Sequence, residues 1–139
     1  MLVVVAVVSI LAAAAIPFAE TTLQRRQELE LRETLRTTRR AIDAFHDDWR
    51  AERIADPEEV ASAAGYPLAL DVLLDGVALE EPPVRRRYLR RPPENPFGAW
   101  RLRGHAQEAG AAAWDGEDVY DLEPDTDRIA LDGTAISGW

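Results

Sequence analysis

Apolar side chains fill the first nineteen residues almost without interruption, and the chain after them is polar, charged and broken by prolines. At a rise of about 1.5 Å per residue, this segment makes a helix of about 28 Å, close to the ~30 Å hydrocarbon core of a bilayer. Its valines favour a strand in water, but in lipid a helix satisfies its own backbone hydrogen bonds. The pattern predicts a transmembrane or assembly helix over residues 1–19, kinked by Pro17.

A second pattern starts at Glu20, where apolar residues begin to recur at helical spacing. Neither glycine nor proline interrupts residues 20–55. The pattern therefore predicts an amphipathic helix over residues 20–54, continuous with the apolar segment, whose apolar stripe holds a folded head. The stripe consists of Leu31, Leu35, Thr38, Ile42, Phe45 and Trp49.

Residues 55–91 predict an insertion of short helices and loops. Asp56 and Pro57 form a helix-start pattern, and this helix would run to Ala64 and stop at Gly65. A second short helix is expected over residues 68–77, ended by Gly76. Arginines surround Tyr88 in residues 85–91, but the run is short and the chain is acidic, so we expect no binding to nucleic acid.

Residues 92–139 predict a small sheet followed by an acidic loop. Trp100 and Leu102 alternate with arginines that would face outward, and residues 118–122 alternate in the same way. A loop over residues 105–114 joins the two segments, and residues 129–131 and 135–136 are candidates for short final elements. The expected fold class is α+β, with one long N-terminal helix packed on a small antiparallel sheet.

The charge is unevenly distributed along the chain. The formal net charge is −9, every basic residue is arginine, and cysteine is absent, which excludes disulfides and thiol chemistry. Residues 25–40 are basic and residues 108–132 are acidic. Opposite charges at two ends of a subunit suit packing of a head on a neighbouring stem, and two solvated faces are the other interpretation.

The sequence carries no catalytic motif, and we expect no enzyme activity. The two histidines, His46 and His105, lie far apart in the sequence. The acidic loop is the better candidate for a site, because calcium favours several carboxylate and carbonyl oxygens in a flexible loop. We expect Asp125, Asp127 and Asp132 to be its ligands, and a solvated acidic turn is the alternative.

The sequence resembles the type IV pilin and pseudopilin superfamily, most closely the major pseudopilins of type II secretion systems. The resemblance rests on three features over nearly the whole chain. The apolar stem with Pro17 is similar to the family's N-terminal helix. Residues 95–98, Asn-Pro-Phe-Gly, resemble the turn before its first strand, and residues 118–122 followed by the acidic loop and Trp139 resemble its ending.

The resemblance implies a structural subunit held in the bacterial inner membrane by a single span, with its head in the periplasm. Subunits would polymerise with one another, alongside minor pseudopilins and an inner-membrane assembly platform, to help export folded proteins. It also implies a leader cut by a prepilin peptidase, N-terminal methylation and calcium in the acidic loop. We expect the gene to begin upstream of Met1, with such a leader and a glutamate. The alternatives are a truncated chain and a processed form numbered from an internal methionine.

Two alternative functions are consistent with the same sequence. One is a type IV pilin for adhesion, motility or DNA uptake. The other, from a different class, is an exported soluble binding domain whose signal segment is still attached. In that alternative the signal would be cleaved before Glu20.

Overall fold

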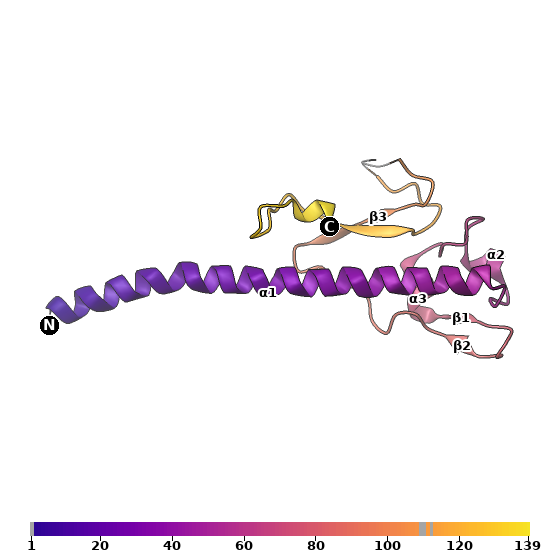
Figure 1. Ribbon diagram of the computed structural model, residues 1–139, viewed down its shortest axis with the longest axis horizontal. Coiled ribbons are helices and arrows are strands. Elements are labelled where there is room, and N and C mark those ends of the chain that lie inside the picture. Colours follow the sequence, from indigo (N-terminus) through magenta and orange to yellow (C-terminus); the bar gives the residue numbers. More distant parts are fainter. Residues whose placement is uncertain (1, 109–110, 112) are drawn as a thin grey trace.

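The computed structural model describes the chain of 139 residues except Met1, residues 109–110 and residue 112. The architecture is α+β, as expected, and is dominated by the helix α1, Leu2–Arg50 (Figure 1). The remaining elements are α2 (Pro57–Val60), α3 (Leu70–Asp75), β1 (Val77–Ala78), β2 (Arg85–Arg86), β3 (Ala99–Arg103), β4 (Asp121–Asp125) and the 3-10 helix η1 (Ile136–Gly138).

Helix α1 is one continuous rod of 49 residues that runs through Pro17. Its N-terminal half extends clear of all other elements, and the head is built on its C-terminal half (Figure 1). Among the described residues, no helix combines the length and the apolar content that crossing a membrane requires. The side chains of residues 10–19, which make up much of the predicted span, lie outside the described part of the structure.

The end of α1 corrects the predicted boundary at residue 54. The helix ends at Arg50, and the backbone turns at Glu52, whose φ is 54°. The amide of Arg53 donates to the carbonyl of Asp48, and the amide of Glu52 donates to that of Trp49, which is the Schellman pattern of helix termination. Glycine usually occupies the residue at positive φ, so the glutamate here left no sign of the helix end in the sequence.

The apolar stripe on α1 forms the centre of the core, as predicted. Leu31 and Phe45 are fully buried, and Ile42 is almost fully buried. They belong to one cluster with residues from every part of the head, including Leu73, Leu122 and Ile136. The head therefore has no core of its own, because α1 supplies the middle of it.

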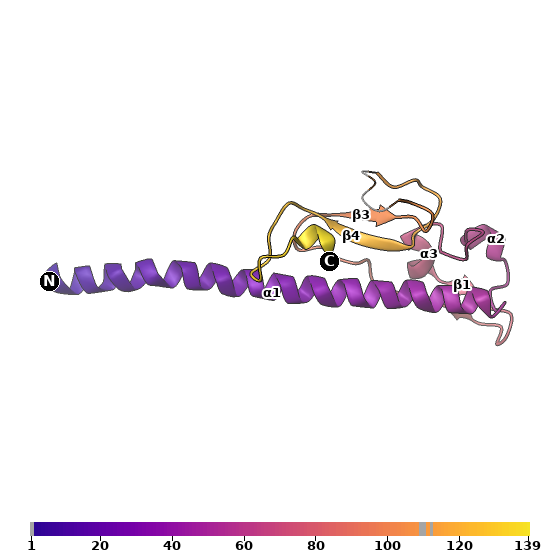
Figure 2. The same cartoon turned by 45° about the horizontal axis from the view of Figure 1, so that its top comes forward.

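The strands form two separate two-stranded sheets, where we had expected one small sheet. β3 pairs antiparallel with β4, and this pair lies along α1 (Figure 2). β4 starts three residues later than predicted, and it contains the buried Pro124 opposite Trp100. Proline is tolerated there because each strand of a two-stranded sheet has an unpaired edge. Trp100 and Leu102 pack against the core, as expected.

The hairpin of β1 and β2 was not predicted. The two strands pair as Val77 with Arg86 and Ala78 with Arg85, below α1 in the view of Figure 1, while β3 and β4 lie above it. Strands of two residues are too short to show the alternation by which a strand is recognised. The head thus covers α1 on two sides, and a wider arc of the helix is buried than its apolar stripe predicts.

The short elements agree only in part with the expectations. α3 ends at Asp75 and is followed by Gly76, whose φ is 79°, so the helix stops at this glycine as predicted. α2 is one turn long and ends at Val60, four residues before the expected end, and Asp56 makes no side-chain cap. Ile129 and Ala135 form an isolated antiparallel bridge that leads into η1. Residues 109–110 and 112 of the predicted loop lie outside the described residues.

Candidate assembly surface and acidic loop

The N-terminal half of α1, which extends away from the head and which we call the free half, begins with an exposed apolar surface. Five valines in its first two turns are between 51% and 76% exposed: Val3, Val4, Val5, Val7 and Val8. The hydroxyl of Ser9 donates to the carbonyl of Val5 at 2.8 Å, so this polar group is satisfied within the helix. Such a surface gains free energy when lipid or another helix removes it from water.

Of the three predicted calcium ligands, Asp125 is the last residue of β4, and Asp127 and Asp132 lie in the segment that follows the strand. Asp125 forms an ion pair with Arg101 on the neighbouring strand, and Asp132 pairs with Arg32 of α1 at 3.2 Å. Asp127 is exposed. Within the described part of the chain, no group of three or more His, Asp or Glu side chains is arranged to hold a metal ion. The structure therefore does not bring the three carboxylates together.

Asp132 is held in its ionised form by its own turn. The hydroxyl and the amide of Thr134 both donate to its carboxylate, at 2.6 and 2.9 Å, and lower the pKa of Asp132. The guanidinium of Arg32 lowers this pKa further. The carboxylate is thus charged and already has cationic and neutral donors. A calcium ion in this loop would have to replace the contacts of Asp132 with Arg32 and of Asp125 with Arg101.

Calcium remains a testable prediction for this loop. We expect millimolar calcium to raise the melting temperature of the full chain by roughly 5 °C, because a ligand that binds only the folded state stabilises it. The double substitution Asp127→Asn/Asp132→Asn should abolish the rise, and magnesium at the same concentration is the ionic control. An unchanged melting temperature in millimolar calcium contradicts the site.

The acidic C-terminal part of the chain folds back on the basic part of α1. We call residues 126–139 the C-terminal strap, and Figure 2 shows it beside α1. The carboxylate of Glu28 accepts the amide of Leu131 at 2.8 Å, and the guanidinium of Arg32 lies 4.1 Å from the ring centroid of Trp139. The opposite charges noted in the sequence therefore meet within one subunit, at least in part.

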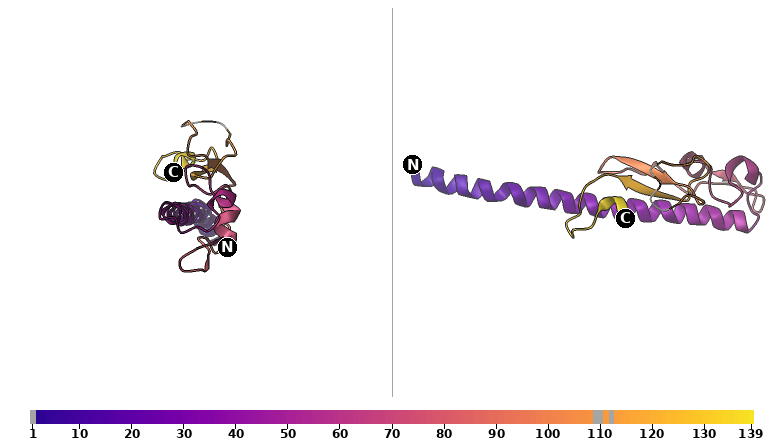
Figure 3. Two further views of the ribbon diagram at one scale, coloured as in Figure 1. Left: turned by 90° about the vertical axis from the view of Figure 1, so that its right-hand side faces the viewer. Right: turned by 90° about the horizontal axis from the view of Figure 1, so that it is seen from above.

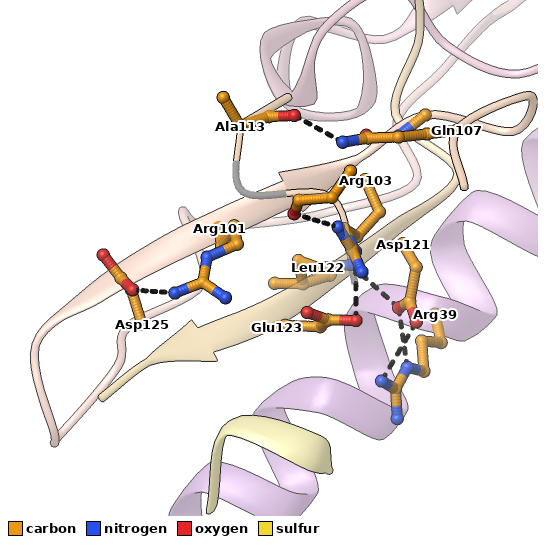
Figure 4. A network of polar contacts seen from close by, with 11 residues as sticks. Arg39, Arg101, Arg103, Gln107, Ala113, Asp121, Leu122, Glu123 and Asp125 are labelled. Atoms are coloured by element: carbon orange, nitrogen blue, oxygen red, sulfur yellow. Dashed lines mark hydrogen bonds and ion pairs between the residues drawn. The ribbon is translucent and has the colours of Figure 1, made fainter. Parts of the chain in front are cut away.

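Two further carboxylates, both in β4, also form ion pairs with arginines (Figure 4). Arg103 pairs with Glu123 at 3.1 Å, and Arg39 of α1 holds Asp121 through two hydrogen bonds of 2.8 and 3.1 Å. The Arg39 contact fastens β4 to α1. Asp121 and Glu123 thus have a structural role in this part of the head.

Asp48 is the centre of a second polar cluster, between α1 and the β1–β2 hairpin. It is only 1% exposed, and its carboxylate accepts hydrogen bonds from Arg86 at 2.7 and 3.0 Å, from the hydroxyl of Tyr88 at 2.6 Å and from Arg53. Burial, followed by the hydrogen bond to Asp48, raises the pKa of Tyr88. The sequence showed Asp48 only as a member of an acidic pair.

The two histidines, distant in sequence, lie on either side of one tyrosine ring. His46 stacks on Tyr66 with a centroid separation of 4.5 Å, and His105 stacks on it at 5.1 Å. The Nδ1–H group of His46 donates to the carbonyl of Gly65 at 3.1 Å. The stack joins α1, the loop after α2 and the loop after β3. Sequence spacing held no signal for it, because its members come from three separate segments.

Comparison of the chain with protein-family profiles, with curated proteins and with solved structures finds no match in any of the three. The function is therefore argued from the residues and their geometry. The two surfaces available for that argument are the free half of α1 and the charged faces of the head.

Proposed function

We propose that the chain is a structural subunit of a type II secretion pseudopilus, a filament that helps to export folded proteins. The observation that carries the proposal is the division of α1 into two halves with different roles. The C-terminal half supplies the centre of the head's core. The ribbon of the N-terminal half extends away from the head and lies clear of its helices and strands (Figures 1 and 3).

The exposed valines support an assembly role for the free half. A monomeric soluble protein rarely exposes a contiguous apolar patch of this kind, and such patches are typical of interaction surfaces. In the proposal, residues 1–19 lie in the bacterial inner membrane as a single span, and the head lies in the periplasm. On assembly, the apolar residues exchange contacts with lipid for contacts with the same segment of sister subunits.

The proposed partners follow from this arrangement. The first partner is the chain itself, and the others are minor pseudopilins and an inner-membrane assembly platform. A prepilin peptidase is a further partner if the gene encodes a leader upstream of Met1. Continuity of the helix through Ala19 and Glu20 supports one rod, since a signal segment cleaved before Glu20 would have to be cut inside α1.

A crosslinking experiment tests self-assembly directly, because the chain has no cysteine. We expect Val8→Cys to give disulfide-linked dimers between copies in membranes under mild oxidation, since a filament core brings the free helices together. Asp71→Cys, at an exposed position on α3, reports the background of chance collisions. Electron microscopy of the same preparations should show filaments.

Two results would overturn the proposal. The first is Val8→Cys chains that crosslink no faster than Asp71→Cys chains. The second is wild-type membranes that yield no filaments under conditions of high expression. Neighbouring genes for a secretion ATPase and an outer-membrane secretin would support the secretion system, whereas genes for a retraction ATPase would indicate a pilus.

A further inference from the structure

The head has two separate surfaces of opposite charge whose charges are not fully compensated by ion pairs within the subunit. One place is a row of arginines on α1, which we call the basic face: Arg32, Arg36, Arg39 and Arg40. With Leu35, Asp43 and Trp139, these residues line a groove of about 420 Å³. The end-on view of Figure 3 shows other elements above, to the right of and below α1 and none to its left, which leaves one flank of the helix uncovered.

The charges of the basic face are only partly compensated within the subunit. Arg32 and Arg39 pair with Asp132 and Asp121, as described above. Arg36 has a single contact of 3.6 Å with Glu33, and both side chains are more than 60% exposed. Arg40 is exposed, and no ion pair of its side chain is recorded among the described residues. Arg36 and Arg40 thus remain available to a partner.

The second place is the far end of the head, which we call the acidic tip. It gathers five exposed glutamates from the end of α1, from α2 and from the turn between β1 and β2 (Figure 1): Glu52, Glu58, Glu59, Glu80 and Glu81. Arg53 at this end is already engaged with the buried Asp48. Glu52 and Glu80 line a groove of about 500 Å³ together with Arg50.

The two surfaces lie at different heights on the same rod. Arg36 and Glu52 are both on or next to α1, and the rise per residue places them about 24 Å apart along its axis. Parallel copies displaced by about this distance bring the acidic tip of one to the basic face of the next. Such a contact joins two different surfaces. Each added copy therefore still has one free surface for a further copy, and the assembly can grow into a filament.

We infer that the basic face of one copy, through Arg36 and Arg40, docks on the acidic tip of a second copy and sets the direction and stagger of subunits in the filament. The inference rests on the proposed function. Exposed ion pairs are individually weak and are screened by salt. They therefore select the register, whereas the apolar halves of α1 supply most of the attraction.

Crosslinking between two differently tagged copies tests the contact. Arg40→Cys in one copy and Glu80→Cys in the other should form a mixed disulfide, and Arg40→Cys alone should form no disulfide with itself. A disulfide between two Arg40→Cys copies, without the mixed product, would show a symmetric contact and overturn the inference.

Charge reversal supplies the second test. Arg36→Glu/Arg40→Glu should lower the yield of filaments at least tenfold, and Glu52→Arg/Glu80→Arg in the same chain should restore it. Arg90→Glu/Arg91→Glu changes the net charge equally outside both surfaces and should leave the yield unchanged. Normal filaments from Arg36→Glu/Arg40→Glu would overturn this contact and leave the proposed function standing. By contrast, if Val8→Cys in an otherwise wild-type chain gave no crosslinks, the proposed function itself would be refuted.

Discussion

Replacing Asp48 by alanine is expected to lower the free energy of unfolding by about 3 kcal/mol, because it leaves two arginines and the Tyr88 hydroxyl without their shared acceptor. Loss of one member of a buried ion pair often costs about 3–5 kcal/mol, and the lower end applies because Arg53 and Arg86 are nearly half exposed. Urea unfolding of the full chain in detergent, followed by the fluorescence of its four tryptophans, measures the change.

Asp47 supplies the matched control for this prediction. It is the preceding residue of the same helix and has the same side chain, but it is exposed. Asp47→Ala should therefore change the free energy of unfolding by no more than about 0.5 kcal/mol. If the two substitutions gave equal losses, the effect would come from helix propensity or net charge, and the role of the buried cluster would be refuted.

Gly65→Ala is expected to destabilise the head by about 3 kcal/mol, through two effects that add. Gly65 has a φ of 84°, which a residue with a Cβ adopts at a cost of about 1–2 kcal/mol. The new methyl group would also lie 2.2 Å from Cε3 of Trp49, so the indole ring must move, and overpacking of this kind costs about 1–3 kcal/mol. The same urea titration measures the total.

Gly116 separates the two contributions. Its φ is 80°, but a Cβ there would meet no atom within 4 Å. Gly116→Ala should thus show the backbone cost alone, about 1 kcal/mol. A loss for Gly65→Ala no larger than that for Gly116→Ala would mean that Trp49 moves aside freely, and the packing of the aromatic stack would not be the constraint inferred here.

The apolar stripe of α1 was predictable because burial on one side of a helix leaves a regular pattern, from Leu31 to Phe45. Asp48 and the buried Ala41 were not, because they lie outside the stripe, on the arc that β2 and Tyr88 cover. A two-residue strand has no recognisable alternation, so the sequence did not indicate that a second face of α1 is covered. The end of α1 was missed for a related reason, since Glu52 occupies a position where glycine is the usual signal.

The candidate sites show the same limit. Asp125 and Asp132 were expected to be ligands because acidic residues cluster locally in the sequence. Both side chains also pair with arginines, Asp125 with Arg101 and Asp132 with Arg32, and the pairing of Arg32 with Asp132 spans 100 residues. Local composition cannot distinguish a carboxylate that binds a metal ion from one that pairs with an arginine distant in the sequence. The stacking of His46 and His105 on Tyr66 is likewise a product of tertiary folding.

The contacts of the C-terminal strap have a consequence for the order in which the head folds. Each hairpin closes a short loop, whereas the bonds from Gln24 and Glu28 of α1 to residues 129 and 131 close loops of more than 100 residues. Loop-closure entropy grows with length, so these contacts form after the hairpins. During synthesis from the N-terminus, part of the apolar stripe of α1 therefore stays uncovered until residues 126–139 have been made.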